Sequence, residues 1–282
     1  MSTTCAFSFP LIGVERDGEE YNLIGSTEHV EARMAELRRN GVAYLNVDVA
    51  VTGSDFEASA SPILQTALLR VLERVADPVS NKTLRTIWAE KGSTLKGLGA
   101  GSDYVAFQDM AGTSSLDMGF SGPGFPYHSC YDNFDWMEKF GDPEFQYHRT
   151  MAQVWALLIL EVADRELLPF DFEVYASAVK GYVDDLEGYA KVKGAEDEKF
   201  ALTVLHQAAD EFKKNAEEFQ AWGKAWEDAV GQGGFESKVM AIKRMSHNSR
   251  MGNFETNLLD IDGGVSKGWI PLCTRLDLTV HL

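Results

Sequence analysis

Residues 41–48, GVAYLNVD, form a short apolar run that begins at a glycine and ends at an aspartate. The run's length and composition predict a buried β-strand over residues 42–47, with Asp48 at its carboxyl end. The preceding residues 27–40 carry apolar side chains at helical spacing, and Gly41 ends this predicted helix. A helix followed by a buried strand is typical of a layered α/β fold.

The sequence after this strand continues the alternation of element types. A helix is predicted from Pro62 to about residue 76, because proline is favoured in the first turn and Ser61 is a suitable N-cap. We then expect a polar, glycine-rich stretch, a short helix and a strand, at residues 78–101, 104–110 and 114–120. These elements predict an α/β domain with a small sheet.

The second half of the chain lacks strand patterns and shows amphipathic helical periodicity. Four helices are expected, at residues 145–168, 172–193, 197–230 and 237–259. Glycines at 194 and 231–234 mark corners between them. Successive helices without strands predict an all-α bundle, so we place a domain boundary at 142/143.

Composition excludes several classes of function. The 282 residues include 26 basic and 43 acidic side chains, a formal net charge of −17. Nucleic acids and anionic membrane surfaces attract basic proteins, so neither is an expected partner. The cysteines Cys5, Cys130 and Cys273 are widely spaced, which argues against a disulfide framework or a thiolate zinc site. No apolar run reaches the roughly 18 residues of a membrane span, and we expect a soluble chain.

Two adjacent carboxylates, Glu19 and Glu20, lie in the segment DGEEY. Neighbouring carboxylates repel each other unless a cation lies close to them. In a metalloenzyme one carboxylate can bind the metal while its neighbour accepts a proton from a water molecule. The alternative is an acidic first turn of the next helix, stabilised by the helix dipole.

Three further residues have side chains suited to a metal centre. Asp48 ends a predicted strand, where α/β proteins commonly place ligand-binding groups, although aspartate is also a common turn residue. His128 lies in a loop and is of a type that binds zinc, although a loop histidine is often an ordinary surface residue. Tyr127 beside it is a potential hydrogen-bond donor to a reacting carbonyl oxygen.

Several segments, in this order, resemble zinc exopeptidases of the glutamate carboxypeptidase II type. They are DGEEYNLIGSTEHVE (17–31), GVAYLNVD (41–48), LGAGSDYVAFQDMAG (98–112), YHSCYDN (127–133) and DPEFQYHRTMAQVWALLILEVADRELLPFDF (142–172). The helical half resembles the dimerisation domain shared with the transferrin receptor. The resemblance implies a partial mixed-sheet peptidase domain over residues 1–142, a helical dimerisation domain over 143–264 and a divergent tail over 265–282. It also implies homodimers.

The resemblance also implies a role for individual residues. Glu19 matches the family's general base, and Tyr127 matches the tyrosine that binds the developing oxyanion. Glu20 and His128 match ligands of one zinc ion, and Asp48 matches a ligand of a second. Other implied roles concern the substrate pocket and a possible structural calcium site. Leu23 and Gly101 match positions that shape the substrate pocket, and Glu28 and Glu31 match the calcium ligands. The substrate implied is a peptide or dipeptide that loses a terminal amino acid.

The sequence departs from this family in places that matter for activity. A histidine and a bridging aspartate, the family's other zinc ligands, have no counterpart among the eighteen residues before Glu19. The arginines near the family's substrate pocket have no counterpart around residues 117–119. We therefore expect a chain truncated at both ends that binds zinc poorly and has little or no peptidase activity.

Two alternatives to this fragment of a peptidase remain. The first is a non-catalytic protein that dimerises through its helices, as the transferrin receptor does. The retention of five groups suited to one site argues against it. The second is a complete hydrolase with one metal ion, held by Glu20, His128 and a substitute ligand. That hypothesis needs an additional donor that the sequence does not identify.

Overall fold

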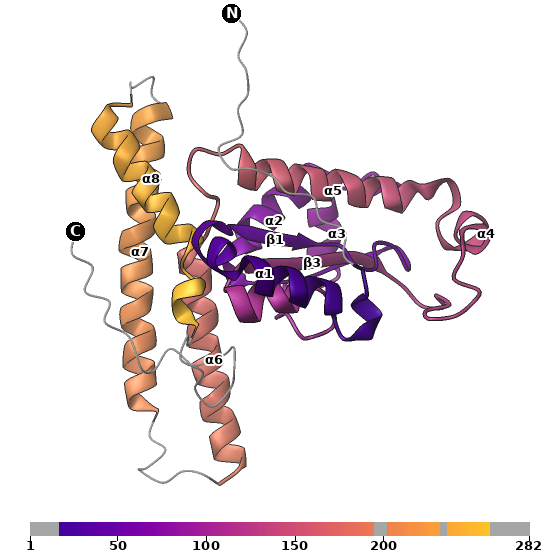
Figure 1. Ribbon diagram of the computed structural model, residues 1–282, viewed down its shortest axis with the longest axis horizontal. Coiled ribbons are helices and arrows are strands. Elements are labelled where there is room, and N and C mark those ends of the chain that lie inside the picture. Colours follow the sequence, from indigo (N-terminus) through magenta and orange to yellow (C-terminus); the bar gives the residue numbers. More distant parts are fainter. Residues whose placement is uncertain (1–16, 195–201, 232–235, 260–282) are drawn as a thin grey trace, which may run out of the picture.

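The computed structural model of this chain describes residues 17–194, 202–231 and 236–259. A three-stranded sheet lies in the α/β part, with the strand order β1–β3–β2 (Figure 1). β1 (Ala43–Asn46) pairs in parallel with β3 (Ser114–Ser121), and β2 (Asp55–Ala60) pairs with β3 in antiparallel fashion. The small mixed sheet predicted from the sequence is confirmed.

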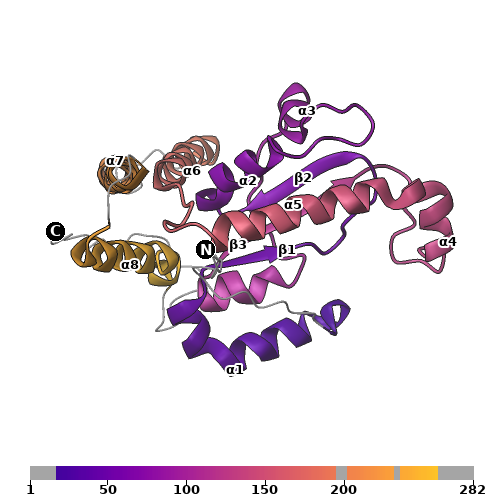
Figure 2. The ribbon, with the colours of Figure 1, turned by 90° about the horizontal axis from the view of Figure 1, so that it is seen from above.

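Helices cover both faces of the sheet (Figure 2). α1 (Ile24–Asn40) lies on one face and packs on the π-helical segment Ala106–Ala111. α2 (Gln65–Leu72) and α5 (Gln146–Ala163) lie together on the other face. Tyr44 of β1 contacts the α1 side, where its ring stacks on Phe107 with centroids 4.0 Å apart.

The main core lies between the sheet and the helices α2 and α5. Leu116, Met118 and Phe120 alternate along β3 and are buried, as expected for a strand with one face on the core. Phe120 contacts the ring of Phe56 on β2 at 5.5 Å and the ring of Tyr147 on α5 at 5.1 Å. The same core continues into the helical region.

The elements that were not predicted include a strand and a helix of the α/β part. β2 has the sequence DFEASA, whose small and polar residues give a weak strand signal, yet Phe56, Ala58 and Ala60 alternate into the core. α3 (Leu84–Glu90) lies inside the stretch that was expected to be irregular. Its N-terminus is capped by Thr83, whose hydroxyl oxygen accepts a hydrogen bond from the backbone N–H of Thr86.

The helical region consists of α6 (Phe172–Val192), α7 (Thr203–Gly231) and α8 (Lys238–Gly252). α6 and α7 pack side by side (Figure 1). α5 lies on the sheet, where it packs against α2, β1 and β3, and does not join this bundle. α4 (Phe134–Trp136) is a short turn in the loop before α5.

Three predicted helices end earlier than expected. The helix expected to reach residue 168 ends at Ala163, and the helix expected to reach 259 ends at Gly252, followed by a 3-10 turn at Thr256–Leu258. The helix after Pro62 begins as a 3-10 turn and ends at Leu72. Ser61 does not cap that helix, because its hydroxyl donates to Oε1 of Glu255 at 2.6 Å.

Within residues 17–194, 202–231 and 236–259, no helix combines the length and the apolar character that a membrane span requires. The limits 1–142 and 143–264 of the two domains stay predictions. The predicted tail, 265–282, lies outside the described residues.

Candidate active site

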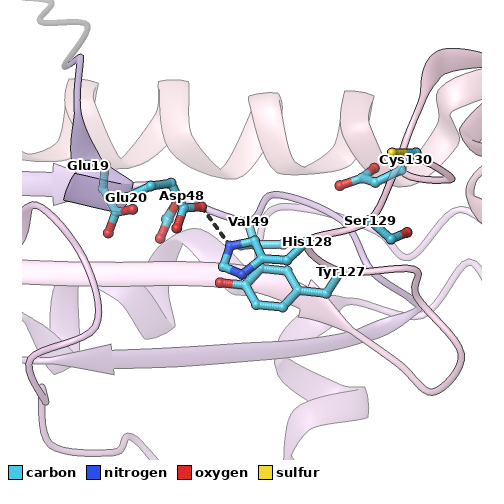
Figure 3. Close-up of a pocket in the computed structure, with 9 residues that line it drawn as sticks. Glu19, Glu20, Asp48, Val49, Tyr127, His128, Ser129 and Cys130 are labelled. Atoms are coloured by element: carbon cyan, nitrogen blue, oxygen red, sulfur yellow. Dashed lines mark hydrogen bonds and ion pairs between the residues drawn. The ribbon is translucent and has the colours of Figure 1, made fainter. Parts of the chain in front are cut away.

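An open pocket of about 470 Å³ lies where three segments of the α/β part meet (Figure 3). These segments are the turn before α1, the loop after β1 and the loop after β3. The residues that line the pocket are Glu19, Glu20, Asp48, Val49, Tyr127, His128, Ser129, Cys130 and Asp132. The pocket thus contains all five side chains to which the sequence assigned zinc or catalytic roles.

The turn that carries Glu19 and Glu20 is a 3-10 helix, Glu19–Tyr21. It follows Gly18, whose φ of 70° lies in the left-handed region that glycine tolerates best. The turn also brings the backbone of Gly25 close to that of Asp17. A Cβ atom at position 25 would lie 2.1 Å from the carbonyl oxygen of Asp17, so this position requires glycine. The two glycines of the segment DGEEYNLIG therefore permit the compact shape that presents both carboxylates.

Asp48 lies in an irregular connection directly after β1. The side chain of the preceding strand residue, Asn46, is buried, and its amide nitrogen donates to Oγ of Ser102 and to Oδ1 of Asp117, both at 2.9 Å. Burial raises the pKa of the Asp117 carboxyl, the Asn46 amide opposes this shift, and the charge of Asp48 adds to it.

His128 and Tyr127 form the opposite wall of the pocket. The ring of Tyr127 stacks on the ring of His128, with centroids 3.7 Å apart. Nε2 of His128 lies 2.6 Å from Oε1 of Glu20, and the dashed line in Figure 3 marks this contact. His128 has a φ of 54°, a strained backbone conformation for a residue other than glycine. Such strain is frequent at functional sites.

The carboxylates of the pocket influence one another. The pKa of Glu19 is raised, first by burial and then by the negative charges of Asp48, Glu20 and Asp103, while His128 lowers it. The pKa of Tyr127 is also raised, by desolvation and by the negative charges of Glu20, Asp48 and Glu19. A carboxylate with a raised pKa is better suited to accept a proton near neutral pH than an ordinary glutamate.

The types of donor in this pocket suit zinc, which binds imidazole nitrogen and carboxylate oxygen. The positions of the donors do not form a complete metal site. Across the described part of the chain, no three His, Cys, Asp or Glu side chains are arranged to hold a metal ion. Glu20 and His128 are instead hydrogen bonded directly to each other. The residues fit zinc by chemistry, and their geometry provides only part of its coordination.

Four other residues with predicted roles do not line the pocket. Leu23 precedes α1 with a φ of 58°, and the backbone N–H of Gly101 donates to the hydroxyl of Tyr104 at 3.3 Å. Glu28 and Glu31 lie exposed on α1. Among the described residues, neither carboxylate belongs to a group of three or more His, Cys, Asp or Glu side chains that could hold a metal ion, and the calcium site stays a prediction.

Sequence reasoning missed Asp132, Cys130 and Ser129 as residues of the pocket. All three belong to the segment YHSCYDN, which contains Tyr127 and His128 and was recognised as a unit. A carboxylate four residues after the histidine was the available signal. The hydroxyl of Ser129 accepts from the backbone N–H of Tyr131 and donates to the carbonyl of Pro126, so it orders this loop.

Sequence comparison agrees with this architecture. Residues 11–146 match the sequence model of peptidase family M28, and residues 200–271 match the model of the transferrin receptor-like dimerisation domain. The chain therefore contains a peptidase family M28 region followed by a transferrin receptor-like dimerisation region.

Named relatives give this class more detail. The chain is 46% identical over 176 residues to LAMP1, a probable glutamate carboxypeptidase of Arabidopsis thaliana, covering 61% of this chain and 26% of the relative. It is 36% identical over 262 residues to AMP1, a probable glutamate carboxypeptidase of the same plant, covering 90% of this chain and 35% of the relative. The mouse aminopeptidase NAALADL1 is 30% identical over 220 residues, covering 70% of this chain and 29% of the relative. The predicted resemblance is confirmed, and the chain spans about a quarter to a third of the length of these relatives.

Proposed function

We propose that this chain is part of a zinc exopeptidase that releases a terminal amino acid from a peptide or dipeptide. One observation carries the proposal: Glu19, Glu20, Asp48, Tyr127 and His128 line a single pocket. These residues come from three segments far apart in the sequence. The names of the plant relatives support a carboxypeptidase, and that of the mouse relative an aminopeptidase.

Each of these residues has a role that fits its position. Glu20 and His128 would bind one zinc ion and Asp48 would contribute to a second, as the resemblance implies. Bound zinc would polarise the scissile carbonyl and activate water. Glu19 would accept the proton of that water, and its raised pKa supports this role. Tyr127, whose side chain is exposed in the pocket, would donate a hydrogen bond from its hydroxyl to the carbonyl oxygen. Leu23 and Gly101 would shape the substrate site at a greater distance.

We further propose that the 282-residue chain binds zinc weakly and has little peptidase activity. The hydrogen bond between Glu20 and His128 and the lack of a third ligand in the described residues support this. Metal analysis of the purified chain, combined with an assay of amino-acid release from dipeptides, tests the proposal. We expect substoichiometric zinc and a rate near background. One or two zinc ions per chain with clear turnover would contradict it.

The second candidate function is homodimerisation through the helical region, and it is compatible with the first. Two helices present exposed apolar side chains at helical spacing, which are Tyr182, Leu186 and Tyr189 on α6 and Val239, Ile242 and Met245 on α8. Exposed apolar surface of this kind favours association.

Sedimentation analysis of the Ile242→Asp variant tests this association. We expect a dimer for the unaltered chain and a shift toward monomer for Ile242→Asp, because a buried unpaired carboxylate is unfavourable. Lys243→Asp, a change of charge at the adjacent helix position, is the control. Equal dimerisation of both variants would exclude this face of α8.

A calcium site at Glu28 and Glu31 is a third proposal. The two carboxylates are three residues apart on α1 and therefore share a helix face. Oxygen ligands suit calcium, and other donors are needed to complete its shell. Calcium should raise the melting temperature of the unaltered chain and leave that of a Glu28→Gln/Glu31→Gln variant unchanged. An equal rise in both proteins would place the calcium elsewhere.

A further inference from the structure

The segment that carries Asp48 is a bulge in the edge of the sheet. Asn46 pairs with Asp117 of β3, and Val51 makes the next pairing, with Phe120. The chain advances five residues from Asn46 to Val51 while β3 advances three from Asp117 to Phe120. Two extra residues are therefore accommodated between the pairings. Bulges of this kind redirect side chains and are frequent beside functional sites.

Hydrogen bonds fix both ends of this bulge. At its start, the amide nitrogen of Asn46 donates to Oδ1 of Asp117 and to Oγ of Ser102. The backbone N–H of Asp48 also lies close to the carboxylate of Asp117. At the end of the bulge, Phe120 donates to the carbonyl of Ala50 at 2.9 Å, and its own carbonyl accepts from Thr52 at 2.7 Å.

The bulge also lies in close contact with the backbone of β3. A Cβ atom at Gly119 would lie 2.5 Å from the carbonyl oxygen of Val49. This distance is too short for a real contact, so only glycine permits the bulge to approach β3 here. The bulge is therefore held by hydrogen bonds at both of its ends and by the close approach of Val49 to Gly119.

Within the part of the chain that the structure describes, Asp117 has no ionic partner to compensate for its burial. No ion pair joins it to a lysine, arginine or histidine of the described residues. A partly buried carboxylate without a cation lowers the stability of a fold. The hydrogen bond that it accepts from Asn46 and its proximity to the backbone of Asp48 are the contacts that give Asp117 a role.

We propose that Asp117 and Asn46 are positioning residues that fix the bulge after β1 and hold Asp48 in the pocket. The expected effect of these two residues on zinc binding rests on the proposed function. Their effect on the position of Asp48 rests only on the geometry of the bulge. It assigns a role to the aspartate of β3 through its hydrogen bonds and not through its charge.

The test compares substitutions in the 282-residue chain with two measurements. Hydrogen exchange of the Asp48 amide reports on the bulge, and titration with zinc alone reports on the pocket. Asp117→Ala removes the acceptor, whereas Asp117→Asn keeps an acceptor oxygen and removes the charge. Ser59→Ala is the matched control, because Ser59 pairs with Asp117 from the other side, on β2.

We expect Asp117→Ala to accelerate exchange of the Asp48 amide about tenfold and to weaken zinc binding by roughly 10- to 100-fold, the loss typical of residues that orient ligands. Asp117→Asn should stay close to the unaltered chain in both measurements, as should Ser59→Ala. A loss in Asp117→Asn equal to that in Asp117→Ala would overturn the proposal, because the charge would then be the active property. Unchanged exchange in Asp117→Ala would overturn it as well.

Two further outcomes separate this proposal from the proposed function. If the unaltered chain binds no zinc, the proposed function fails, while exchange of the Asp48 amide still decides the role of Asp117. If Asp117→Ala does not fold, Gly119→Ala replaces it, because one added methyl group disturbs the bulge and leaves every hydrogen-bonding side chain in place. Gly119→Ala should also accelerate Asp48 exchange, and an unchanged rate would overturn the proposal.

Discussion

Glu20 and His128 are 108 residues apart in the sequence, yet Oε1 of the glutamate lies 2.6 Å from Nε2 of the histidine. This contact joins the turn before α1 to the loop after β3 and closes one side of the pocket. A bound metal ion would have to separate the two side chains. The contact therefore ties together the segments that the proposed function requires.

Replacement of His128 by alanine should reduce whatever zinc affinity the chain retains by more than tenfold, because the imidazole is the only nitrogen donor that lines the described pocket. Isothermal titration with zinc measures the change. His206→Ala, on α7, is the control and should bind zinc as the unaltered chain does. Equal affinities for all three proteins would place the zinc outside this pocket.

His247 of α8 should make the stability of the fold depend on pH. Burial, assisted by the charge of Arg250, lowers its pKa to about 4, from the usual value of 6.5. Its ring stacks on Phe219 and lies against Trp222, with centroids 4.0 Å and 4.3 Å away. The folded state disfavours the protonated ring. The contribution of neutral His247 to the stability of the fold is therefore complete above pH 6.5 and is lost as the pH falls toward 4.

Through His247, the free energy of unfolding should fall by up to about 1.4 kcal/mol for each unit by which the pH falls between these limits. Urea unfolding of the unaltered chain at pH 7 and pH 5 measures it. His247→Phe, which cannot be protonated, should show a smaller difference between the two pH values. An identical pH dependence in both proteins would mean that other groups are responsible.

Leu158→Ala should destabilise the fold by about 2–5 kcal/mol, the usual cost of a cavity in a packed core. Leu158 is fully buried on α5 in the core beneath the sheet. Leu160, two residues further along the same helix, is 43% exposed and provides the control. Thermal unfolding should show a large decrease for Leu158→Ala and a small one for Leu160→Ala. Similar decreases would indicate that α5 does not pack as described.

Asp171→Ala should cost about 1 kcal/mol or more through loss of a helix cap. Oδ1 of Asp171 accepts from the backbone N–H of Val174 at 3.0 Å, and Oδ2 accepts from the hydroxyl of Thr66 at 2.6 Å. Asp171→Asn retains a capping oxygen and should lose much less stability. Chemical denaturation compares the two variants, and equal stabilities would argue against a capping role.

Much of the fold was predictable because several segments have a clear period or a continuous apolar run. The helix before Gly41, the strand that ends at Asn46 and the strand that begins at Ser114 were all expected. β2 was missed because Ser59 and the two alanines around it give no strong strand pattern. The location of α5 on the sheet was not predictable, since an amphipathic face does not identify the surface that it covers.

The candidate site was found through ordered motifs and not through local chemistry. Glu19, Glu20 and His128 each had an ordinary alternative, and only the series of matched segments indicated one pocket. The bulge at Asp48 lay beyond prediction because it depends on the pairing of Asn46 and Val51 with a strand some 70 residues away. Asp132 was missed because its loop has no regular period.

The helical region leaves the α/β part and returns to it at nearly the same place. Asp171, the N-cap of α6, donates its backbone N–H to the carbonyl of Ile63, and the chain after α8 brings Glu255 to Ser61. Two attachment points so close together leave no free hinge between sheet and helices. We therefore expect the α/β part and the helical region to unfold in one cooperative transition. We also expect a force that a partner applies to the helices to be transmitted to the segment before α2.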